Sequence, residues 1–437
     1  MIVGIIGLGY VGLTLGVVAA SRGIEVYGSE INPVIKNALR NNKAHFFEKG
    51  LNDLILEHNN KNFHVVDSFP KDVKFDAFIL TVGTPLIGHD VKRPNFDYIL
   101  SALKSLTGIY DGSQMIILRS TVSVGTTRNI VLPQLSAMCG KPKDDILVGM
   151  CPERTIEGKA LVELTTLPQI ISGNNAESIE IAKDLFLRIT PDVVEAECIE
   201  EAELAKLYCN TYRDITFALG NAFCLAAQQF GVDGVKAIET ANMRYPRSNI
   251  AKPGFVAGPC LEKDAYILLN NMTGCCSKDF IYSARVLNES LEYAVCDYVK
   301  RKVGKPGQNN TLTLSGMAFK GRPATSDLRG SSSVYIAQKL AEMGYRLNLH
   351  DFVALPQDMH ALNLGKCYLA DALFDACKNS SMLLVLNNHE YYSQLPYDAS
   401  LSGKTVLDAW NVCDNWHKYP DIKIDTIGTI NIINKEN

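Results

Sequence analysis

The sequence predicts an α/β protein with two parallel-sheet domains separated by a long helix. Its 437 residues are enough for two or three domains that each bury a core of their own. Up to about residue 190, short apolar and β-branched runs alternate with helical patterns, and the alternation resumes after residue 310. Between these regions the apolar residues have helical spacing.

The first alternating region contains six apolar runs that are short enough for strands. They are Ile2–Ile6, Glu25–Gly28, Ala77–Thr81, Met115–Leu118, Leu147–Met150 and Gln169–Ser172. Helical patterns separate them, as at Tyr98–Leu106 and Ala176–Arg188. Strand and helix in turn predict a parallel sheet that is covered by helices on both faces.

The uncharged N-terminal stretch Met1–Ala20 admits a second interpretation, a membrane span or a signal sequence. No basic segment precedes the apolar run, and glycines interrupt it at positions 4, 7, 9 and 12. A buried strand, a turn and a buried helix explain the same composition. We therefore expect no membrane segment.

A segment with one glycine and no proline runs from Glu200 to about Gln229. A helix of about thirty residues is long for the interior of a globular domain. We expect it to bridge two domains or to lie in a dimer interface, and we expect more helix to about residue 302. The apolar positions with helical spacing are Leu204, Leu207, Tyr208, Tyr212, Ile215 and Leu219.

A turn or linker is predicted at Gly304–Asn310 because glycine, proline and asparagine cluster there. A smaller α/β domain follows, with strands at Leu312–Leu314, Arg346–His350, Met382–Leu386 and Thr405–Leu407 and a helix at Val334–Met343. The predicted division is a cofactor-binding domain at 1–195, a central helical region at 196–303 and a C-terminal domain at 304–437.

Composition excludes several classes of protein. A net charge of −4 gives no basic face for nucleic acid. The 12 cysteines form no Cys-x-x-Cys pair, so we expect no metal site. Without an export signal, we expect these thiols to be reduced and the protein to be cytoplasmic.

The first predicted strand runs directly into Gly7-Leu8-Gly9-Tyr10-Val11-Gly12. Glycines in this pattern allow a tight turn and close approach of the backbone to a diphosphate at the start of a helix. Glu30 ends the second strand, where a carboxylate can bind ribose hydroxyls and repel a 2′-phosphate. The cofactor we expect is NAD; the alternative is a glycine-rich turn without a ligand.

The segment Lys252–Asp264 places one thiol, Cys260, behind a turn rich in glycine and proline. Most intracellular cysteines are small core residues, so Cys260 alone indicates nothing. Together with a nicotinamide site, a nucleophilic thiol indicates oxidation of an alcohol past the aldehyde, through a thioester, to an acid.

These two segments and several others together resemble the nucleotide-sugar (UDP-glucose/GDP-mannose) dehydrogenase family, almost end to end. The other stretches are Val82-Gly83-Thr84-Pro85, Ser120–Thr126, Cys151-Pro152-Glu153-Arg154-Thr155-Ile156-Glu157-Gly158 and Gly316-Met317-Ala318-Phe319-Lys320 with Asp327 and Arg329. The resemblance implies two Rossmann-like, doubly wound domains joined by a long helix that builds a homodimer. It implies a UDP-sugar as the substrate.

The resemblance also implies roles for individual residues. Cys260 would be the nucleophile, Lys206 and Asn210 would stabilise the developing oxyanion, and Asp264 would orient a water or relay a proton. Glu153 resembles the base that activates water, and Thr121 the hydroxyl that positions it. The implied cofactor contacts are Gly7, Gly9, Tyr10, Val11, Gly12, Glu30, Thr84, Thr121, Lys263 and Arg329. The implied substrate contacts are Glu153, Arg154, Glu157, Lys206, Asn210, Arg213, Arg247, Phe255, Gly258, Phe319 and Lys320, with Arg247 reaching the neighbouring subunit's site.

Two departures from the family's pattern stand near these residues. The usual glycine pair before the cysteine is Val256-Ala257-Gly258 here, and Ala257 needs a negative φ where glycine is free. We therefore expect a slightly different turn. The usual Val-Pro-Thr-Pro is Val82-Gly83-Thr84-Pro85.

The substrate and two other functions stay open. Asn210-Thr211-Tyr212-Arg213-Asp214 and Cys151-Pro152-Glu153-Arg154 resemble the branch that acts on 2-acetamido sugars; UDP-glucose is the alternative. A two-electron hydroxy-acid dehydrogenase would need neither Cys260 nor Glu153. A nucleotide-sugar-binding protein without catalysis is the other alternative. The predicted product is a uronic acid for cell-surface polysaccharide synthesis.

Overall fold

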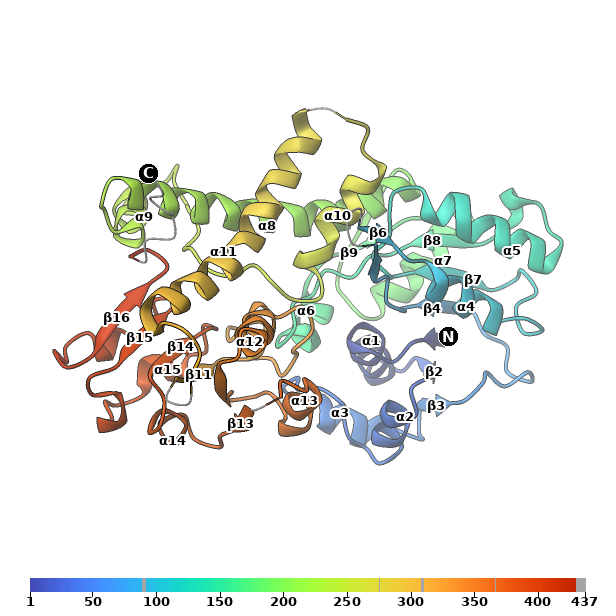
Figure 1. Ribbon diagram of the computed structural model, residues 1–437. Coiled ribbons are helices and arrows are strands. Elements are labelled where there is room, and N and C mark those ends of the chain that lie inside the picture. The colour runs from blue at the N-terminus through green and yellow to red at the C-terminus, as the bar shows by residue number, and fades with distance from the viewer. Residues whose placement is uncertain (89–91, 275, 308–309, 366, 430–437) are drawn as a thin grey trace. The chain divides into compact units, whose positions relative to one another are not determined.

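The computed structural model describes residues 1–88, 92–274, 276–307, 310–365 and 367–429. These residues form two compact units, the first from 1–209 with 266–273 and the second from 210–265 with the described residues from 274 to 429 (Figure 1). The predicted turn at Gly304–Asn310 includes positions 308 and 309, which lie outside the described residues.

The first unit contains a sheet of six parallel strands, which confirms the predicted strands from Ile2–Ile6 to Leu147–Met150. In spatial order the strands are β3 (Phe63–Val66), β2 (Glu25–Ser29), β1 (Ile2–Ile6), β4 (Ala77–Leu80), β7 (Met115–Leu118) and β8 (Val148–Met150). Strand β3 was not predicted. The last predicted strand, β9 (Gln169–Ile171), pairs in parallel with β10 (Val193–Glu195) in a separate sheet.

Side chains that alternate along these strands build two cores, one on each face of the sheet. Ile79 joins the core with Leu13 of helix α1 (Tyr10–Ser21), whereas Phe78 and Leu80 join the core with Leu103 of helix α4 (Asp97–Ser105). This two-residue period confirms helices on both faces. The unit's elements are α1 (Tyr10–Ser21), α2 (Pro33–Arg40), α3 (Leu51–His58), α4 (Asp97–Ser105), α5 (Leu132–Cys139), α6 (Ala160–Thr166), α7 (Ala176–Leu187), β5 (Leu86–Ile87) and β6 (Arg93–Pro94).

The predicted long helix is confirmed as α8, Ile199–Gln229, with 31 residues. It contributes residues to both units, as does α10 (Leu261–Asn271). The remaining helices of the central region are α9 (Gly234–Asn242) and α11 (Cys276–Val303). No helix within the described residues is both long enough and apolar enough to cross a membrane.

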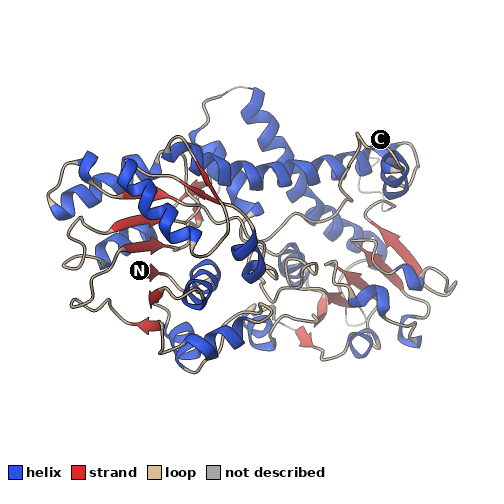
Figure 2. Cartoon of the chain, turned by 180° about the vertical axis from the view of Figure 1, so that it is seen from behind, coloured by secondary structure: helices blue, strands red, loops and turns tan. Residues whose placement is uncertain are grey.

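The second unit contains another sheet of six parallel strands, visible from behind in Figure 2. In spatial order they are β13 (Cys367–Leu369), β12 (Arg346–His350), β11 (Thr311–Ser315), β14 (Met382–Val385), β15 (Thr405–Asp408) and β16 (Lys423–Thr426). Its helices are α12 (Ser332–Glu342), α13 (Pro356–Ala361), α14 (Leu373–Cys377) and α15 (Tyr391–Gln394). Both sheets have the strand order of a Rossmann fold, 3-2-1-4-5-6, which confirms the predicted fold class.

Candidate active site

The glycine turn after β1 has the geometry of a diphosphate-binding site. Gly7 has φ +94° and donates its N–H to Ser29 O at 2.8 Å. A Cβ on Gly12 would lie 1.9 Å from Gly7 O, so a larger residue cannot close this turn. Within the described residues no side chain caps the start of α1, so N–H groups of its first turn can bind an anion.

Glu30 lies beside this turn, directly after β2. One carboxylate oxygen accepts the backbone N–H of Leu8 at 2.8 Å, and the other accepts that of Asn32 at 2.8 Å. The side chain is largely buried, and its position is fixed by both bonds. An oriented carboxylate beside a glycine turn suits the two ribose hydroxyls of NAD.

The loops after β4 and β7 meet the same edge of the sheet. Thr81 Oγ1 donates to Gly7 O at 2.6 Å, and Thr84 Oγ1 donates to the carbonyl of Thr121 at 2.6 Å. Residues from four parallel strands therefore converge at their carboxyl ends, where this fold binds ligands. Thr84 fixes the backbone of Thr121, the predicted water-positioning residue.

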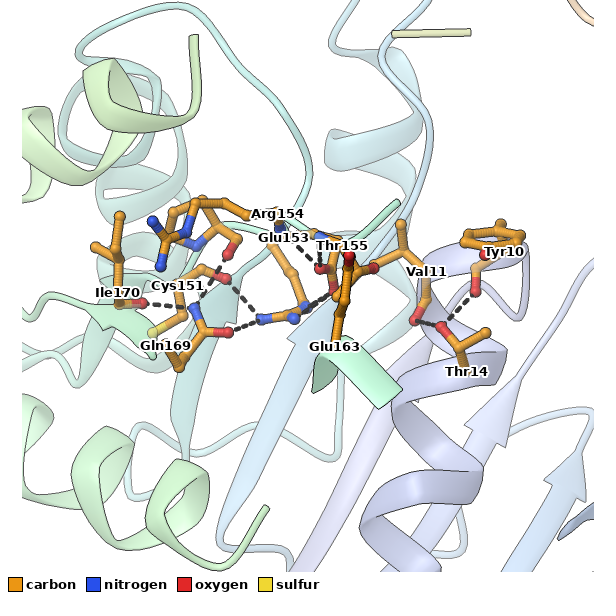
Figure 3. A network of polar contacts seen from close by, with 12 residues as sticks. Tyr10, Val11, Thr14, Cys151, Glu153, Arg154, Thr155, Glu163, Gln169 and Ile170 are labelled. Atoms are coloured by element: carbon orange, nitrogen blue, oxygen red, sulfur yellow. Dashed lines mark hydrogen bonds and ion pairs between the residues drawn. The ribbon is translucent and has the colours of Figure 1, made fainter. Parts of the chain in front are cut away.

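Glu153, after β8, is buried rather than solvated as a loop carboxylate beside proline commonly is (Figure 3). One oxygen accepts the backbone N–H groups of Arg154 at 2.7 Å and Thr155 at 2.6 Å, and the other pairs with Arg119. Burial raises the pKa of Glu153, but the charges of Arg119 and Lys206 and the Thr155 N–H outweigh it, so the pKa is lowered.

The rest of the loop after β8 is linked through Glu48 to Tyr10, which belongs to the Gly7–Gly12 segment. Tyr10 donates its hydroxyl to Glu48, which also accepts the backbone N–H of Gly158 at 2.7 Å and that of Ala160 at 3.0 Å. Burial and the Glu48 carboxylate raise the pKa of Tyr10, and the charge of Glu157 adds to the shift. The predicted residues Tyr10 and Glu157 therefore belong to one cluster.

The Cys260 segment lies in the second unit. Cys260 is exposed and directly precedes α10. The positive φ of the turn, +96°, falls on Gly258 and not on Ala257, so the alanine departure is accommodated. Gly258 donates its N–H to Gly330 O at 2.7 Å, and a Cβ there would lie 2.4 Å from the Phe319 ring.

Asp264, fully buried, joins two other predicted residues. Its carboxylate accepts from Asn210 Nδ2 at 2.6 Å and from Lys263 Nζ at 2.8 Å. Burial lowers the pKa of Lys263, but the Asp264 carboxylate and the Cys260 thiol outweigh it, so the pKa is raised. Lys206, on α8 one turn before Asn210, is also buried, which is uncommon for a lysine and argues against a solvated helix charge.

A buried arginine that the sequence did not single out holds both ends of the Cys260 loop. Arg285 donates to Val256 O at 2.9 Å, to Leu261 O at 3.0 Å and to Asp214 Oδ1 at 2.6 Å. Burial raises the pKa of Asp214, although Arg285 opposes this. Asp214, in the stretch that resembles the acetamido-sugar branch, thus helps to hold this loop.

The other predicted substrate residues are spread over the two units. Arg154 donates to Pro168 O, and Arg213 is exposed. Arg247 is exposed and stacks on Tyr245, and Phe255 is buried in the core of the second unit. Lys320 lies 5.3 Å from the Phe319 ring centre, and Arg329 is exposed and ion-paired with Asp327 at 2.6 Å.

Sequence profiles of one family cover three segments of the chain. The profile described as the NAD binding domain of the UDP-glucose/GDP-mannose dehydrogenase family matches residues 1–190. Those of its central and UDP binding domains match 200–290 and 313–415. The chain belongs to this family.

Individual relatives share the same class. A UDP-N-acetyl-D-mannosamine dehydrogenase from Methanococcus vannielii is 31% identical over 436 residues, covering 97% of this chain and 96% of the relative. The solved UDP-N-acetyl-mannosamine dehydrogenases from Pyrococcus horikoshii and Staphylococcus aureus are each 26% identical. Their TM-scores are 0.83 and 0.84, with 99% of this chain and 100% of each structure covered. The protein is therefore an enzyme, an NAD-dependent nucleotide-sugar dehydrogenase.

Proposed function

We propose that the enzyme oxidises the C6 hydroxyl of a UDP-2-acetamido-2-deoxyhexose to the carboxylate, in two successive two-electron steps. The exposed thiol of Cys260, held directly before α10 beside Lys263 and Asp264, carries this proposal. A two-electron dehydrogenase has no use for such a nucleophile. The names of the relatives, which act on UDP-N-acetyl-mannosamine, support the acetamido sugar.

The first unit would hold NAD at Gly7–Gly12, with Glu30 on the ribose hydroxyls. When bound, NAD accepts one hydride in each of the two oxidations. In the second unit, the segment with Phe319, Lys320 and Arg329 would hold the nucleotide diphosphate. Two cations there suit the charge of a diphosphate.

In the first oxidation, C6 loses a hydride and its hydroxyl loses a proton, which gives the aldehyde. Asp264 would receive or relay that proton, because its carboxylate is oriented by Asn210 and Lys263. Lys206 would stabilise the negative charge that develops on the oxygen, with Asn210 as a second donor.

In the second oxidation, Cys260 Sγ adds to the aldehyde carbon to form a thiohemiacetal. Loss of the second hydride and of the hydroxyl proton leaves a thioester on Cys260. Water then attacks the carbonyl carbon, the C–S bond breaks, and the acid and the thiol are released. Glu153 would orient and activate that water, helped by Thr121.

The experiment measures NADH and acid production with NAD and a panel of UDP-sugars that includes UDP-glucose. We expect two NADH per acetamido sugar consumed; one NADH would indicate the hydroxy-acid type of dehydrogenase. Cys260→Ala should lower acid production by on the order of 10³-fold while NAD still binds. Cys260→Ser should be nearly as poor, because an alcohol is the weaker nucleophile.

Glu153→Gln separates the two stages of this reaction. It should release a burst of nearly two NADH per active site, followed by very slow turnover, with a hydroxylamine-sensitive adduct on Cys260 visible by intact mass. Wild-type acid production by Cys260→Ala, or a stalled enzyme without the adduct, would refute the thioester.

We also propose a homodimer. Helix α8 exposes Tyr212, Leu219 and Phe223, which lie seven and four residues apart and so share one face, and α11 exposes Phe280 and Tyr293. Covering such a face with a second copy removes apolar surface from water. Light scattering that finds a fully active monomer at all concentrations would contradict this.

The proposed domain division stays at 1–195, 196–303 and 304–437, supported by the three matched segments. A nucleophilic thiol has to stay reduced, which supports a cytoplasmic location. The proposed uronic acid would serve as a precursor of cell-surface polysaccharide. Cell fractionation that placed the active enzyme outside the cytoplasm would contradict this location.

A further inference from the structure

We propose that Arg119 is a positioning residue for the hydrolysis step. It holds the carboxylate of Glu153 ionised and in one orientation, and Gln169 in turn holds Arg119. This inference rests on the proposed role of Glu153, and the variants chosen to test it separate the failure of one from the failure of the other.

Arg119 follows β7 directly, at the carboxyl edge of the first sheet. Its side chain is 1% exposed and that of Glu153 is 8% exposed. Removing two charges from water is costly unless both are paired and hydrogen-bonded. A buried ion pair at the ligand-binding edge of a sheet therefore needs hydrogen-bond partners that offset the cost of desolvation, and Arg119 and Glu153 have such partners.

The guanidinium group of Arg119 contacts three separate elements. Its Nε donates to Glu153 Oε2 at 3.1 Å, and its Nη2 donates to the same oxygen. Its Nη1 donates to Cys151 O at 3.1 Å and to Gln169 Oε1 at 2.9 Å. Its Cζ lies 5.4 Å from the ring centre of Phe186. These contacts leave the guanidinium one orientation.

Gln169, the first residue of β9, completes the network in Figure 3. Its Oε1 faces Arg119, so its Nε2 points to the loop and donates to Pro152 O at 3.0 Å and to Ile170 O at 2.6 Å. One amide thus fixes both the arginine and the residue before Glu153. With the backbone bonds on Glu153 Oε1, both carboxylate oxygens are constrained.

The charged groups around Glu153 come from four elements. Arg119 and Lys206 lower its pKa, the latter from α8, and Arg154 follows it in the loop. Glu163 of α6 accepts the N–H of Ile156 at 2.7 Å and lines, with Arg119, Glu153 and Gln169, a cavity of about 20 Å³. That volume fits one water molecule. The side chain of Arg119 is hydrogen-bonded to the carboxylate of Glu153. If Arg119 is removed, the desolvation of Glu153 is opposed less, and this favours the protonated form of its carboxyl group.

The test is the pH dependence of acid formation by the full enzyme with NAD and the UDP-sugar. Arg119→Met should lower kcat by on the order of tenfold or more near pH 6 and much less near pH 9, because Glu153 then protonates at higher pH. Arg119→Lys keeps the positive charge but loses the planar guanidinium group with its several N–H donors. It should therefore lower kcat a few-fold and keep the wild-type pH profile.

Three controls accompany these variants. Arg128→Met removes an arginine whose pair with Glu200 is partly exposed, and it should leave the profile unchanged. Glu153→Gln gives the background of hydroxide attack. Combining Arg119→Met with Glu153→Gln should match Glu153→Gln alone, because Arg119 acts through Glu153.

The possible outcomes distinguish a failure of the positioning role of Arg119 from a failure of the proposed function. If Glu153→Gln stalls as an adduct but Arg119→Met keeps the wild-type profile, or the double variant is slower than Glu153→Gln, the positioning role is refuted. If Glu153→Gln does not stall, the proposed function fails first. If Arg119→Met does not fold, Gln169→Leu replaces it: a lower kcat with unchanged KM supports the role, and unchanged kcat overturns it.

Discussion

The two parallel sheets of this enzyme share a turn and differ in the segment that leads from this turn to the next helix. In the first sheet, Gly7 has φ +94° and donates its N–H to Ser29 O; in the second, Gly316 has φ +89° and donates its N–H to His350 O at 2.9 Å. Each second strand is followed by a carboxylate that accepts a backbone N–H from the turn. These pairs are Glu30 with Leu8 at 2.8 Å and Asp351 with Ala318 at 2.9 Å.

The difference lies in the length of that segment. Helix α1 begins at Tyr10, three residues past Gly7, so a diphosphate can sit against its N-terminus. Helix α12 begins only at Ser332. The loop before it carries Phe319, Lys320 and Arg329 and accepts the N–H of Gly258, two residues before Cys260. The same topology therefore offers a helix end in one unit and a loop of side chains in the other.

The largest effect expected from this difference concerns a pair of glycines. In Gly12→Ala the new Cβ lies 1.9 Å from the backbone oxygen of Gly7. We expect the free energy of NAD binding or of unfolding to fall by about 3 kcal/mol, while UDP still binds. In Gly258→Ala the new Cβ lies 2.4 Å from a ring, and the residue has a left-handed conformation. We expect the activation free energy of turnover to rise by about 1–3 kcal/mol while NAD binding is kept. Calorimetric titrations with NAD and with UDP check the binding, and steady-state turnover with NAD and the UDP-sugar checks Gly258→Ala.

If either glycine variant lost both ligands together while staying folded, the turn at Gly7–Gly12 and the loop at Gly258 would not serve separate ligands.

A smaller effect is expected from His350, which stands in the second sheet where Ser29 stands in the first. Burial lowers the pKa of His350 to about 4, and its Nδ1 lies 2.9 Å from Ser315 Oγ. Between about pH 6.5 and pH 4 the unfolded state binds more protons, so stability falls as the pH falls through this window. From pH 7.5 to pH 5 this amounts to about 2 kcal/mol.

Urea unfolding of wild type and His350→Gln at these two pH values measures the contribution. The variant should lose about 2 kcal/mol less stability on acidification than wild type does. An equal loss in both proteins would show that His350 titrates normally in the folded state.

The last prediction concerns the two matched carboxylates. Glu30 should favour NAD over NADP by about tenfold or more, since repulsion of a 2′-phosphate costs on the order of 1–3 kcal/mol. Glu30→Gln should reduce this preference in kcat/KM, whereas Asp351→Asn should leave it unchanged. Equal turnover of the wild type with NADP would show that Glu30 does not select the cofactor, and a shifted preference in Asp351→Asn would show that the carboxylate of the second sheet also contributes.

The architecture of both units could be predicted from local patterns. Apolar runs gave the strands from Ile2–Ile6 to Thr405–Leu407, and the uninterrupted helical spacing gave α8. The missed strands carry weaker signals. Strand β3 mixes His64 with apolar residues, and β16 alternates lysine and aspartate with isoleucine, so composition did not separate them from loops.

Glu30, Glu153 and Cys260 each lie in a motif and were singled out as site residues from the sequence. The buried residues that hold Glu153 and the Cys260 loop in place, Arg119 and Arg285, were not. Arg119 is 34 residues from Glu153, and Arg285 is 29 from Val256 and 71 from Asp214. The single signal for Arg119 is a charge directly after a four-residue apolar strand, at the edge where parallel strands end.

Local sequence patterns were enough to predict the two sheets, the long helix, the glycine turn after β1 and the candidate thiol of Cys260, because each depends on spacing or residue types within a short stretch. The folded structure was needed to show that Glu153 is buried against Arg119, that Asp264 binds Asn210 and Lys263, and that Arg285 holds the loop of Cys260. These contacts escape local patterns because a buried charge needs partners, and packing brings those partners from distant parts of the chain.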